Sequence, residues 1–348
     1  MSSATPFRAL RTTAAACRPL RLLGSGVAGA LPSVPSTAID TRLGLAAGTV
    51  ERRSGVRSRG VESCRSAAAL GAEAARAAVA NAGLSLHDID AVIAASATMD
   101  QAMPCNAALI HRELGPGVRA IPAFDIGASC LGFIVALDTA AALLAAGRYR
   151  RILVVAADIA SCGLDWEHLE ASAIFGDGAA AVVVDTGSPA DRPGAGLLAA
   201  AFETHSDGAH FCEIRGGGSR YHPSRIDGPF APLAQFRMDG QAVFRLAVRR
   251  LGPFIDALLA DAGLTLSDID LVIPHQASRH GLDFLARLLR LPRDRIVDIF
   301  ATHGNQVAAS LPSALHHAGR EGRLRPGTHA LLIGTGAGVS FGGLVLRC

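Results

Sequence analysis

The chain has 348 residues, of which half are apolar and 18% are charged, and its formal net charge is +3. This length and composition favour a large α/β protein with a buried core. They give no support for a nucleic-acid-binding protein, because the excess of positive charge is small. All 33 basic residues are arginine, so Schiff-base chemistry, a pyridoxal-phosphate anchor and a phosphate-loop lysine are excluded.

The seven cysteines are widely scattered, without a Cys-X-X-Cys pair or a neighbouring histidine pattern. Such spacing argues against a disulfide framework or a metal site and favours a reducing compartment. No apolar run reaches the length that spans a bilayer. We therefore expect a cytoplasmic protein with no metal, no resident cofactor, and no membrane or nucleic-acid partner.

The first segment of the chain, residues 1–20, is expected to be a disordered extension. It is rich in Arg, Ser and Ala, and no acidic residue occurs before Asp40. The same composition is typical of an organellar transit peptide, which is the less favoured alternative. In both cases we expect the folded part to begin at residue 21.

An internal repeat predicts two similar α/β halves. The segments AGLSLHDIDAVI (82–93) and AGLTLSDIDLVI (262–273) agree at nine of twelve positions. Each follows a stretch with helical spacing and runs through a turn into a short apolar segment typical of a buried strand. The match indicates a repeat rather than coincidence.

The predicted halves span residues 21–190 and 236–348, and each has a further apolar strand, at 149–158 and at 327–336. The stretch between the halves, residues 191–235, is rich in Gly and Pro and is expected to form connecting loops over the surface. Substrate contacts often lie in loops of this kind.

A candidate nucleophile lies in the first half, in the segment AIPAFDIGASC. Residues 120–126 are a predicted strand and residues 131–147 a predicted helix, so Cys130 lies at a strand-to-helix turn. Unpaired N–H groups at a helix N-terminus favour a thiolate and lower the pKa of the cysteine. A buried, inert cysteine fits this stretch equally well on its own.

The second half places two polar residues at equivalent positions. His275 follows the predicted strand 269–273, and Asn305 lies near a helix start in DIFATHGNQVAASLPSAL (298–315), which is predicted to repeat the strand–turn–helix form. Ligands of open α/β sheets bind beyond the carboxyl ends of strands. A pseudo-two-fold relation between the halves would bring Cys130, His275 and Asn305 to one cleft.

A set of Cys, His and Asn side chains can perform acyl transfer. The thiolate attacks a thioester, while His and Asn donate hydrogen bonds to the charge that develops on an oxygen. The glycine-rich segment IGTGAGVSFGG (333–343) could add a backbone N–H donor. It lacks the strand, GXGXXG and helix order of a dinucleotide site, so we reject that interpretation.

Over residues 21–348 the chain resembles the β-ketoacyl-acyl-carrier-protein synthase III family of thiolase-fold condensing enzymes. Six motifs carry the resemblance: DIGASCLGF, IFGDGAAAVVV, MDGQAVFR, HQAS, GNQVAASLP and GAGVSFGG. A thiolase would have a second cysteine where this chain has Gly336, Ala337 and Gly338. The chain-elongating synthases have a second histidine where it has Asn305.

The resemblance implies a thiolase-like α/β fold of two pseudo-symmetric halves, packed as a five-layered α-β-α-β-α core. It also implies a two-step reaction, in which a coenzyme A thioester acylates Cys130 and malonyl-acyl-carrier protein then loses CO₂ and attacks the acyl group. His275 and Asn305 would hold the malonyl thioester oxygen. The backbone N–H groups of Cys130 and Ala337 would form the oxyanion hole. Acyl-CoA and the carrier's phosphopantetheine arm are substrates, so no cofactor is implied.

The resemblance further implies a homodimer, with Met103 shaping the acyl pocket across it, although Met103 fits an ordinary core residue equally well. The adenine clamp of the family is weakened, because a tryptophan near Arg53 is absent and Leu169 stands where an arginine is usual. The donor is therefore either coenzyme A bound differently or another thioester, such as an acyl-carrier protein. The implied substrate contacts are Arg53, Ser54, Met103, Trp166, Gly240 and Ser278, and the implied carrier-protein contacts are Arg279 and His280.

Two alternatives to a condensing enzyme stay open at this point. A non-decarboxylating acyltransferase would form the same acyl-Cys130 and pass the acyl group to an alcohol or amine. A non-catalytic thiolase-fold subunit would only bind a partner, and the complete Cys, His and Asn set argues against it. For the condensing enzyme, the expected product is a 3-oxoacyl-carrier protein in lipid, polyketide or cofactor-precursor biosynthesis.

Overall fold

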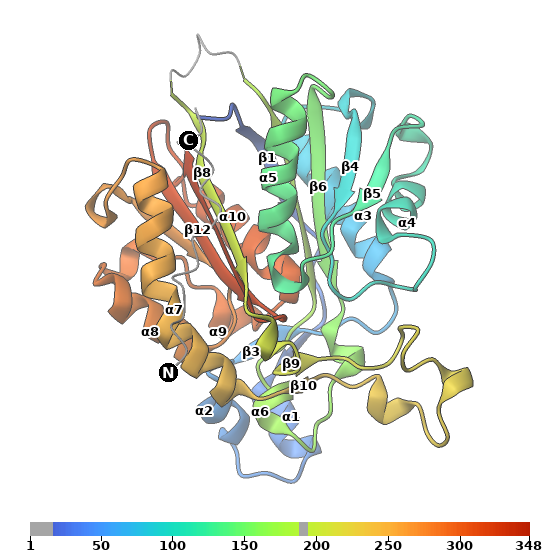
Figure 1. Cartoon of the computed structure of the whole chain (residues 1–348). Coiled ribbons are helices and arrows are strands. Elements are labelled where there is room, and N and C mark those ends of the chain that lie inside the picture. The colour runs from blue at the N-terminus through green and yellow to red at the C-terminus, as the bar shows by residue number, and fades with distance from the viewer. Residues whose placement is uncertain (1–16, 188–193) are drawn as a thin grey trace, which may run out of the picture.

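Two β-sheets form the centre of the molecule (Figure 1), of which the computed structural model describes residues 17–187 and 194–348. The first sheet has the strand order β1 (Arg21–Val27), β7 (Gly178–Asp185), β6 (Arg151–Asp158), β4 (Ala91–Ala94) and β5 (Ala123–Asp125). The second has the order β11 (Leu271–Pro274), β12 (His329–Gly336), β13 (Ser340–Arg347) and β8 (Gly196–Thr204). Two short ribbons pair β2 (Ser33–Pro35) with β3 (Ser58–Gly60) and β9 (Cys212–Glu213) with β10 (Arg237–Met238).

Helices lie between the two sheets and on their outer faces. Between the sheets, a cluster of buried aliphatic side chains includes residues of α5 (Gly132–Ala145) and α10 (Ser310–Arg320). The outer face of the first sheet packs against α3 (Ala67–Asn81) and α4 (Asn106–Leu114). That of the second packs against α7 (Gly240–Asp261) and α8 (Arg279–Leu289). The remaining helices are the short α1 (Ser36–Arg42), α2 (Thr49–Ser54), α6 (Leu169–Ser172) and α9 (Phe300–His303).

The central strands are covered by helices on both faces, and this explains their sequences. β6 and β7 have the sequences RILVVAAD and GAAAVVVD, and each has a single end residue that is partly exposed. A strand buried on both faces needs apolar side chains at successive positions rather than at alternate ones. Each fully buried Val, Leu or Ile contributes roughly 1.5–3 kcal/mol, so these strands anchor the core.

The two repeated segments adopt the same local structure, as predicted. In each, a helix ends, a 3₁₀ turn follows (Leu86–Asp88 or Leu266–Asp268), and β4 or β11 begins. The backbone N–H and the hydroxyl of Ser85 both donate to the Asp88 carboxylate. Thr265 donates to Asp268 in the same way. These bonds cap the start of each 3₁₀ turn, which leads the chain into the sheet. The strands predicted at 149–158 and 327–336 are confirmed as β6 and β12.

The predicted N-terminal extension reaches too far into the chain. Residues 1–16 lie outside the described part, but residues 17–20 belong to the fold. Arg18 and Leu197 exchange backbone hydrogen bonds of 3.0 and 2.9 Å. Leu20 is buried in the cluster between the sheets. The apolar side chain of Leu20 has a place in the core, so these residues belong to the fold despite the basic composition around them.

The connecting stretch predicted as loops over 191–235 contains a full strand of the second sheet. β8 pairs antiparallel with β13 along its length. Its sequence, GLLAAAFET, is rich in alanine, which has weak strand propensity, and Gly and Pro lie just before it. Pairing with a neighbouring strand decides its structure, and a sequence pattern does not report that neighbour.

The strand predicted before Asn305 is also replaced. Ile296 and Asn305 make isolated strand-like bridges, to Val272 and Phe175, and residues 300–303 between them form α9. The Asp298 carboxylate accepts the N–H of Phe300 at 3.1 Å, which favours a helical turn at this point. Within the two described ranges, no helix is long and apolar enough to cross a membrane.

Candidate active site

Cys130 lies in the 3₁₀ turn Ser129–Leu131, between the end of β5 and the start of α5. The turn is pressed against β4, because a Cβ on Gly132 would lie 2.3 Å from the Ala95 carbonyl oxygen. Only glycine allows this approach of backbone to backbone. The predicted strand-to-helix placement of Cys130 is therefore confirmed, and the turn is held rigidly against the first sheet.

The thiol of Cys130 is not activated in the resting protein. Burial raises its pKa to about 12, and the nearby Asp158 carboxylate adds to the rise. Its surroundings include the apolar side chains of Phe175 and Val307. The prediction of a lowered pKa is thus wrong, because removal of water from the thiolate is the largest contribution and raises the pKa. At neutral pH Cys130 is a protonated thiol.

His275 follows β11 directly, and its backbone N–H donates to the Ile333 carbonyl at 2.8 Å. A Cβ on Gly334 would lie 2.9 Å from the Cβ of His275, so β12 passes tightly beneath the ring. Burial lowers the pKa of His275 to about 4. The imidazole is therefore neutral at physiological pH. Its Nδ1 is buried without a partner among the described residues, which leaves Nε2 as the nitrogen that can meet a substrate.

The Asn305 side chain has a fixed orientation. Its Oδ1 accepts the Val307 N–H at 2.8 Å and the Ser310 hydroxyl at 3.3 Å. Its Nδ2 donates one hydrogen to the Ala277 carbonyl at 3.3 Å, which leaves the second hydrogen as a free donor. The backbone of Asn305 is tied to the first half of the chain, because its N–H donates to the Ile174 carbonyl at 2.7 Å.

The turn after Asn305 has the same backbone conformation as the turn that contains Cys130. The 3₁₀ helices Ser129–Leu131 and Val307–Ala309 each lead into a central helix, α5 or α10. Each begins with a non-glycine residue of positive φ, 50° at Ser129 and 54° at Val307. The two turns contact one another. Cys130 therefore matches Ala308 in this comparison, and Asn305 lies just before its turn.

A buried amide connects the segments of His275 and Asn305. Gln276 is fully buried, and its Nε2 donates to the carbonyls of Pro274 at 2.8 Å and Val297 at 3.1 Å. Its Oε1 accepts the Ile299 N–H at 3.0 Å. Every polar atom of the side chain is thus used to join the end of β11 to the segment that leads to Asn305.

A cavity of about 1620 Å³ joins these residues. This volume exceeds that of a typical small-molecule pocket. The structure places ten of the twelve predicted site residues on its walls, namely Arg53, Ser54, Cys130, Gly240, His275, Ser278, Arg279, His280, Asn305 and Ala337. The N–H of Ala337 has no backbone partner within the described ranges, so this turn still offers a donor.

Met103 and Trp166 are the predicted contacts that do not line the cavity. Met103 is 83% exposed, so it is neither cavity wall nor ordinary core in one chain, although Gln101 and Ala102 beside it do line the cavity. Trp166 packs against the cluster that contains Leu169. The guanidinium of Arg42 lies 4.7 Å from the centre of its ring. One face of the indole is therefore already covered by a cation.

Two of the predicted contacts, Ser278 and Arg279, also make hydrogen bonds within the protein. The Arg279 guanidinium donates to both oxygens of Asp298, at 2.6 and 3.3 Å. The hydroxyl of Ser278 accepts the Gly281 N–H at 3.0 Å and so caps α8. Both side chains lie at the cavity, and these bonds hold the start of α8 in place.

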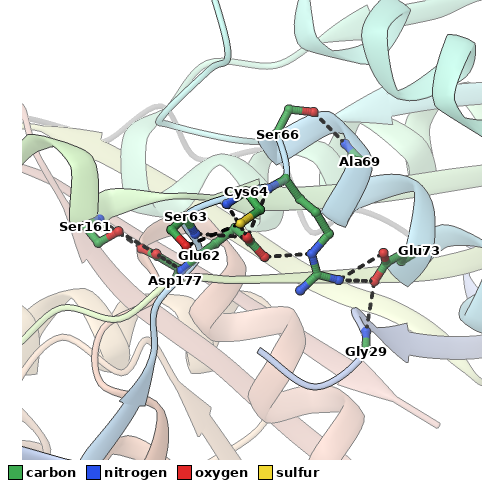
Figure 2. Close-up of polar contacts among 10 residues, drawn as sticks. Gly29, Glu62, Ser63, Cys64, Ser66, Ala69, Glu73, Ser161 and Asp177 are labelled. Carbon is green, nitrogen blue, oxygen red and sulfur yellow. Dashed lines mark hydrogen bonds and ion pairs between the residues drawn. The ribbon is translucent and has the colours of Figure 1, made fainter. Parts of the chain in front are cut away.

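The IFGDG motif holds one wall of the cavity in place. Asp177 accepts hydrogen bonds from the Glu62 N–H at 2.8 Å and from the Ser161 hydroxyl at 2.6 Å (Figure 2). Figure 2 also shows the Glu62 carboxylate accepting the N–H groups of residues 63 to 65. These contacts hold the loop before α3 against the turn Ala160–Gly163, which forms part of the cavity wall.

One polar residue near the nucleophile is absent from the predicted set. Asp158 is fully buried at the carboxyl end of β6, and its carboxylate adds to the raised pKa of the Cys130 thiol. Its signal in the sequence is an acidic residue that ends a buried apolar strand, RILVVAAD. Within the described ranges, no three His, Cys, Asp or Glu side chains gather as a metal site would require.

Comparison with known families agrees with this geometry. The model described as 3-oxoacyl-[acyl-carrier-protein (ACP)] synthase III matches residues 124–208. The model of the C-terminal part of that synthase matches residues 259–348.

Two curated relatives match most of the chain. The β-ketoacyl-[acyl-carrier-protein] synthase III of Bordetella petrii is 39% identical over 299 residues, which are 86% of this chain and 87% of the relative. The enzyme of the same name from Dinoroseobacter shibae is 36% identical over 336 residues, or 94% of this chain and 99% of the relative.

Solved structures give the same result. The 3-oxoacyl-(acyl carrier protein) synthase III of Pseudomonas aeruginosa superimposes with a TM-score of 0.83 at 32% identity, covering 95% of this chain and 98% of that one. The synthase III of Aquifex aeolicus gives a TM-score of 0.84 at 28% identity, covering 94% and 100%. The mixed α/β structure is therefore the thiolase-like fold of condensing enzymes, and the chain belongs to the β-ketoacyl-acyl-carrier-protein synthase III family.

Proposed function

We propose that this protein condenses an acyl group from acyl-CoA with malonyl-acyl-carrier protein, through an acyl-enzyme on Cys130. The observation that carries the proposal is the convergence of Cys130, His275 and Asn305, from three separate elements, on one large cavity. Membership of the synthase III family supports the same activity.

In the first step, the Cys130 sulfur attacks the thioester carbonyl of the acyl donor. The carbon–sulfur bond to coenzyme A breaks, and the thiol proton leaves with coenzyme A as its thiol. The high pKa of Cys130 means that this proton must move as the sulfur attacks. The N–H groups of Cys130 and Ala337 are the proposed donors to the oxygen that becomes negatively charged.

In the second step, malonyl-carrier protein loses CO₂ and the resulting enolate attacks the acyl-cysteine carbonyl. A new carbon–carbon bond forms, and the Cys130 sulfur leaves and regains a proton. The Nε2–H of His275 and the free Nδ2 hydrogen of Asn305 donate to the enolate oxygen. A neutral imidazole can donate here over the whole physiological range, because burial lowers the pKa of His275 to about 4.

The predicted substrate contacts form the rest of the proposal. Arg53 on α2 would bind the phosphates of coenzyme A, and Gly240 and Ser278 would flank the pantetheine arm. Ser54 would only line this part of the cavity, because its buried hydroxyl already donates to the Val50 carbonyl at 2.7 Å. Arg279 and His280 would meet the carrier protein. Trp166 carries Arg42 on one face, which supports a weakened hold on the adenine ring.

We also propose a cytoplasmic homodimer built from two pseudo-symmetric halves in five layers. The residues 21–190 and 236–348 are the proposed halves, and β8 adds a strand to the second. The matching turns at Ser129 and Val307 support the pseudo-symmetry. β5 is the end strand of its sheet, and the exposed Met103 precedes it in sequence, which supports pairing of two copies along this edge.

The function is tested by incubating acyl-CoA and malonyl-carrier protein with the enzyme and measuring CO₂ and the 3-oxoacyl product. We expect equal amounts of both, and a loss of both when His275 and Asn305 are each replaced by alanine. Acyl transfer to Cys130 should persist in that double variant. Turnover without release of CO₂ would instead identify a non-decarboxylating acyltransferase and contradict the proposal.

A further inference from the structure

Asp158 connects two walls of the active site through a single carboxylate. Its Oδ1 accepts the N–H groups of Ala97 at 2.8 Å and Thr98 at 2.7 Å, and the Thr98 hydroxyl at 2.9 Å. Its Oδ2 accepts the N–H of Ala309 at 3.2 Å. Ala97 and Thr98 line the cavity. Ala309 ends the turn that follows Asn305.

The position of Asp158 is unusual for a carboxylate with a purely structural role. It is fully buried at the carboxyl end of β6, and no arginine is bonded to it among the described residues. The hydrogen-bond donors to Asp158 come from the loop after β4 and from the turn Val307–Ala309. They are backbone N–H groups and the Thr98 hydroxyl. The titratable groups that raise the pKa of the Cys130 thiol are Asp158 and Cys212 of β9. Burial raises the pKa of Asp158 to about 6.

We propose that Asp158 is a positioning residue for the condensation: its carboxylate locks the cavity wall at Ala97 and Thr98 to the turn that follows Asn305. The inference rests on the proposed function. Movement of the Asn305 segment relative to Cys130 would misplace the hydrogen-bond donor for the enolate. It would not prevent acyl transfer to the thiol, which does not use Asn305.

The substitution Asp158→Asn separates the two links that the carboxylate makes. The asparagine oxygen can replace Oδ1, which accepts three donors, but the amide nitrogen cannot accept the Ala309 N–H. The variant therefore keeps the link to Ala97 and Thr98, breaks the link to Ala309 and removes the charge. Thr98→Val is a milder variant, because it removes one donor to the carboxylate. It also removes the acceptor of the Ile159 N–H at 3.0 Å.

Three rates are measured in folded protein: alkylation of Cys130 by iodoacetamide, acylation of Cys130 by acyl-CoA in a single turnover, and condensation. In Asp158→Asn, alkylation of Cys130 is the check that the thiol is still present and accessible. Acylation should not slow. Condensation should fall about tenfold or more, because Asn305 is misplaced. In Thr98→Val we expect slower condensation with unchanged alkylation.

Asp40→Asn is the matched control, because Asp40 is also buried and its carboxylate accepts the N–H groups of Gly48 at 2.7 Å and Val50 at 2.8 Å. We expect it to leave alkylation of Cys130 unchanged. Unchanged condensation in folded Asp158→Asn overturns the proposal, and so does an equal loss of acylation and condensation. If that variant does not fold, unchanged condensation in Thr98→Val overturns it. Wild-type protein that fails to condense would count against the proposed function alone.

Discussion

The protonation state of Cys130 sets the first requirement on the chemistry. A thiol with a pKa of about 12 has a very small thiolate fraction at neutral pH. In the proposed reaction the thiol proton is therefore still on Cys130 when the thioester arrives. His275 is also uncharged at neutral pH, because burial lowers its pKa. In the proposed reaction its imidazole therefore meets the enolate as a neutral hydrogen-bond donor.

This state predicts how alkylation of Cys130 depends on pH. Below the pKa the thiolate fraction rises about tenfold per pH unit, so the rate with iodoacetamide should climb steadily from pH ~7 to ~10 without a plateau. Peptide mass spectrometry separates Cys130 from the exposed Cys64, which serves as the internal reference. A plateau below pH ~8 would show an activated thiolate and contradict the burial argument.

At the scale of elements, Gln276 sets the spacing between β11 and the segment before α9. Replacing it with leucine keeps the volume but removes three hydrogen bonds and leaves the Ile299 N–H buried without a partner. We expect Gln276→Leu to lower the free energy of unfolding by about 1–3 kcal/mol, measured by urea denaturation. Condensation should fall more than acylation of Cys130. Equal losses in the two half-reactions would show that Gln276 acts only on stability.

The loop before α3 provides a pH-dependent contribution to stability. Burial opposes ionisation of Glu62, but the N–H groups of Arg65 and Cys64 and the Arg65 guanidinium hold its pKa at about 2. In the unfolded chain the value is about 4.3. The depressed pKa stabilises the fold above about pH 4.3, and this contribution is lost as the pH falls toward 2.

We expect the free energy of unfolding to decrease less between pH ~5 and ~3 in Glu62→Gln than in the wild type, because the variant has no group to protonate. The measurement is urea denaturation at each pH. Glu167→Gln is the control, since Glu167 is exposed and its carboxylate accepts no hydrogen bond in the described part of the chain. Identical pH dependence in Glu62→Gln and the wild type would sink this account of the loop.

At the scale of the whole molecule, the free edge of β5 and the exposed Met103 predict a dimer. Sedimentation equilibrium should give twice the mass of one chain. Met103→Glu should shift the protein toward monomer, because a buried charge at the interface is costly. A monomeric wild type at micromolar concentration would contradict the proposed assembly.

Much of the architecture follows from the sequence, because strong local patterns agree with the final contacts. The repeat around residues 82–93 and 262–273 predicts the helix, turn and strand that form, and the strand-end rule places Cys130 and His275 at one cavity. Asn305 reaches the same cavity from the end of α9, without the strand that the rule assumed. β8 could not be predicted in the same way, since its alanine-rich sequence depends on pairing with β13. The raised pKa of Cys130 and the contacts of Asp158 depend on burial by distant segments, which no local pattern reports.

The central claim is that Cys130 carries the acyl group that is condensed. The most direct measurement is mass spectrometry of the protein after incubation with acyl-CoA, followed by addition of malonyl-carrier protein. We predict one acyl group on Cys130, its discharge as a 3-oxoacyl-carrier protein with release of CO₂, and no adduct in folded Cys130→Ala. An adduct that persists in Cys130→Ala, or one that malonyl-carrier protein does not discharge, would contradict the account.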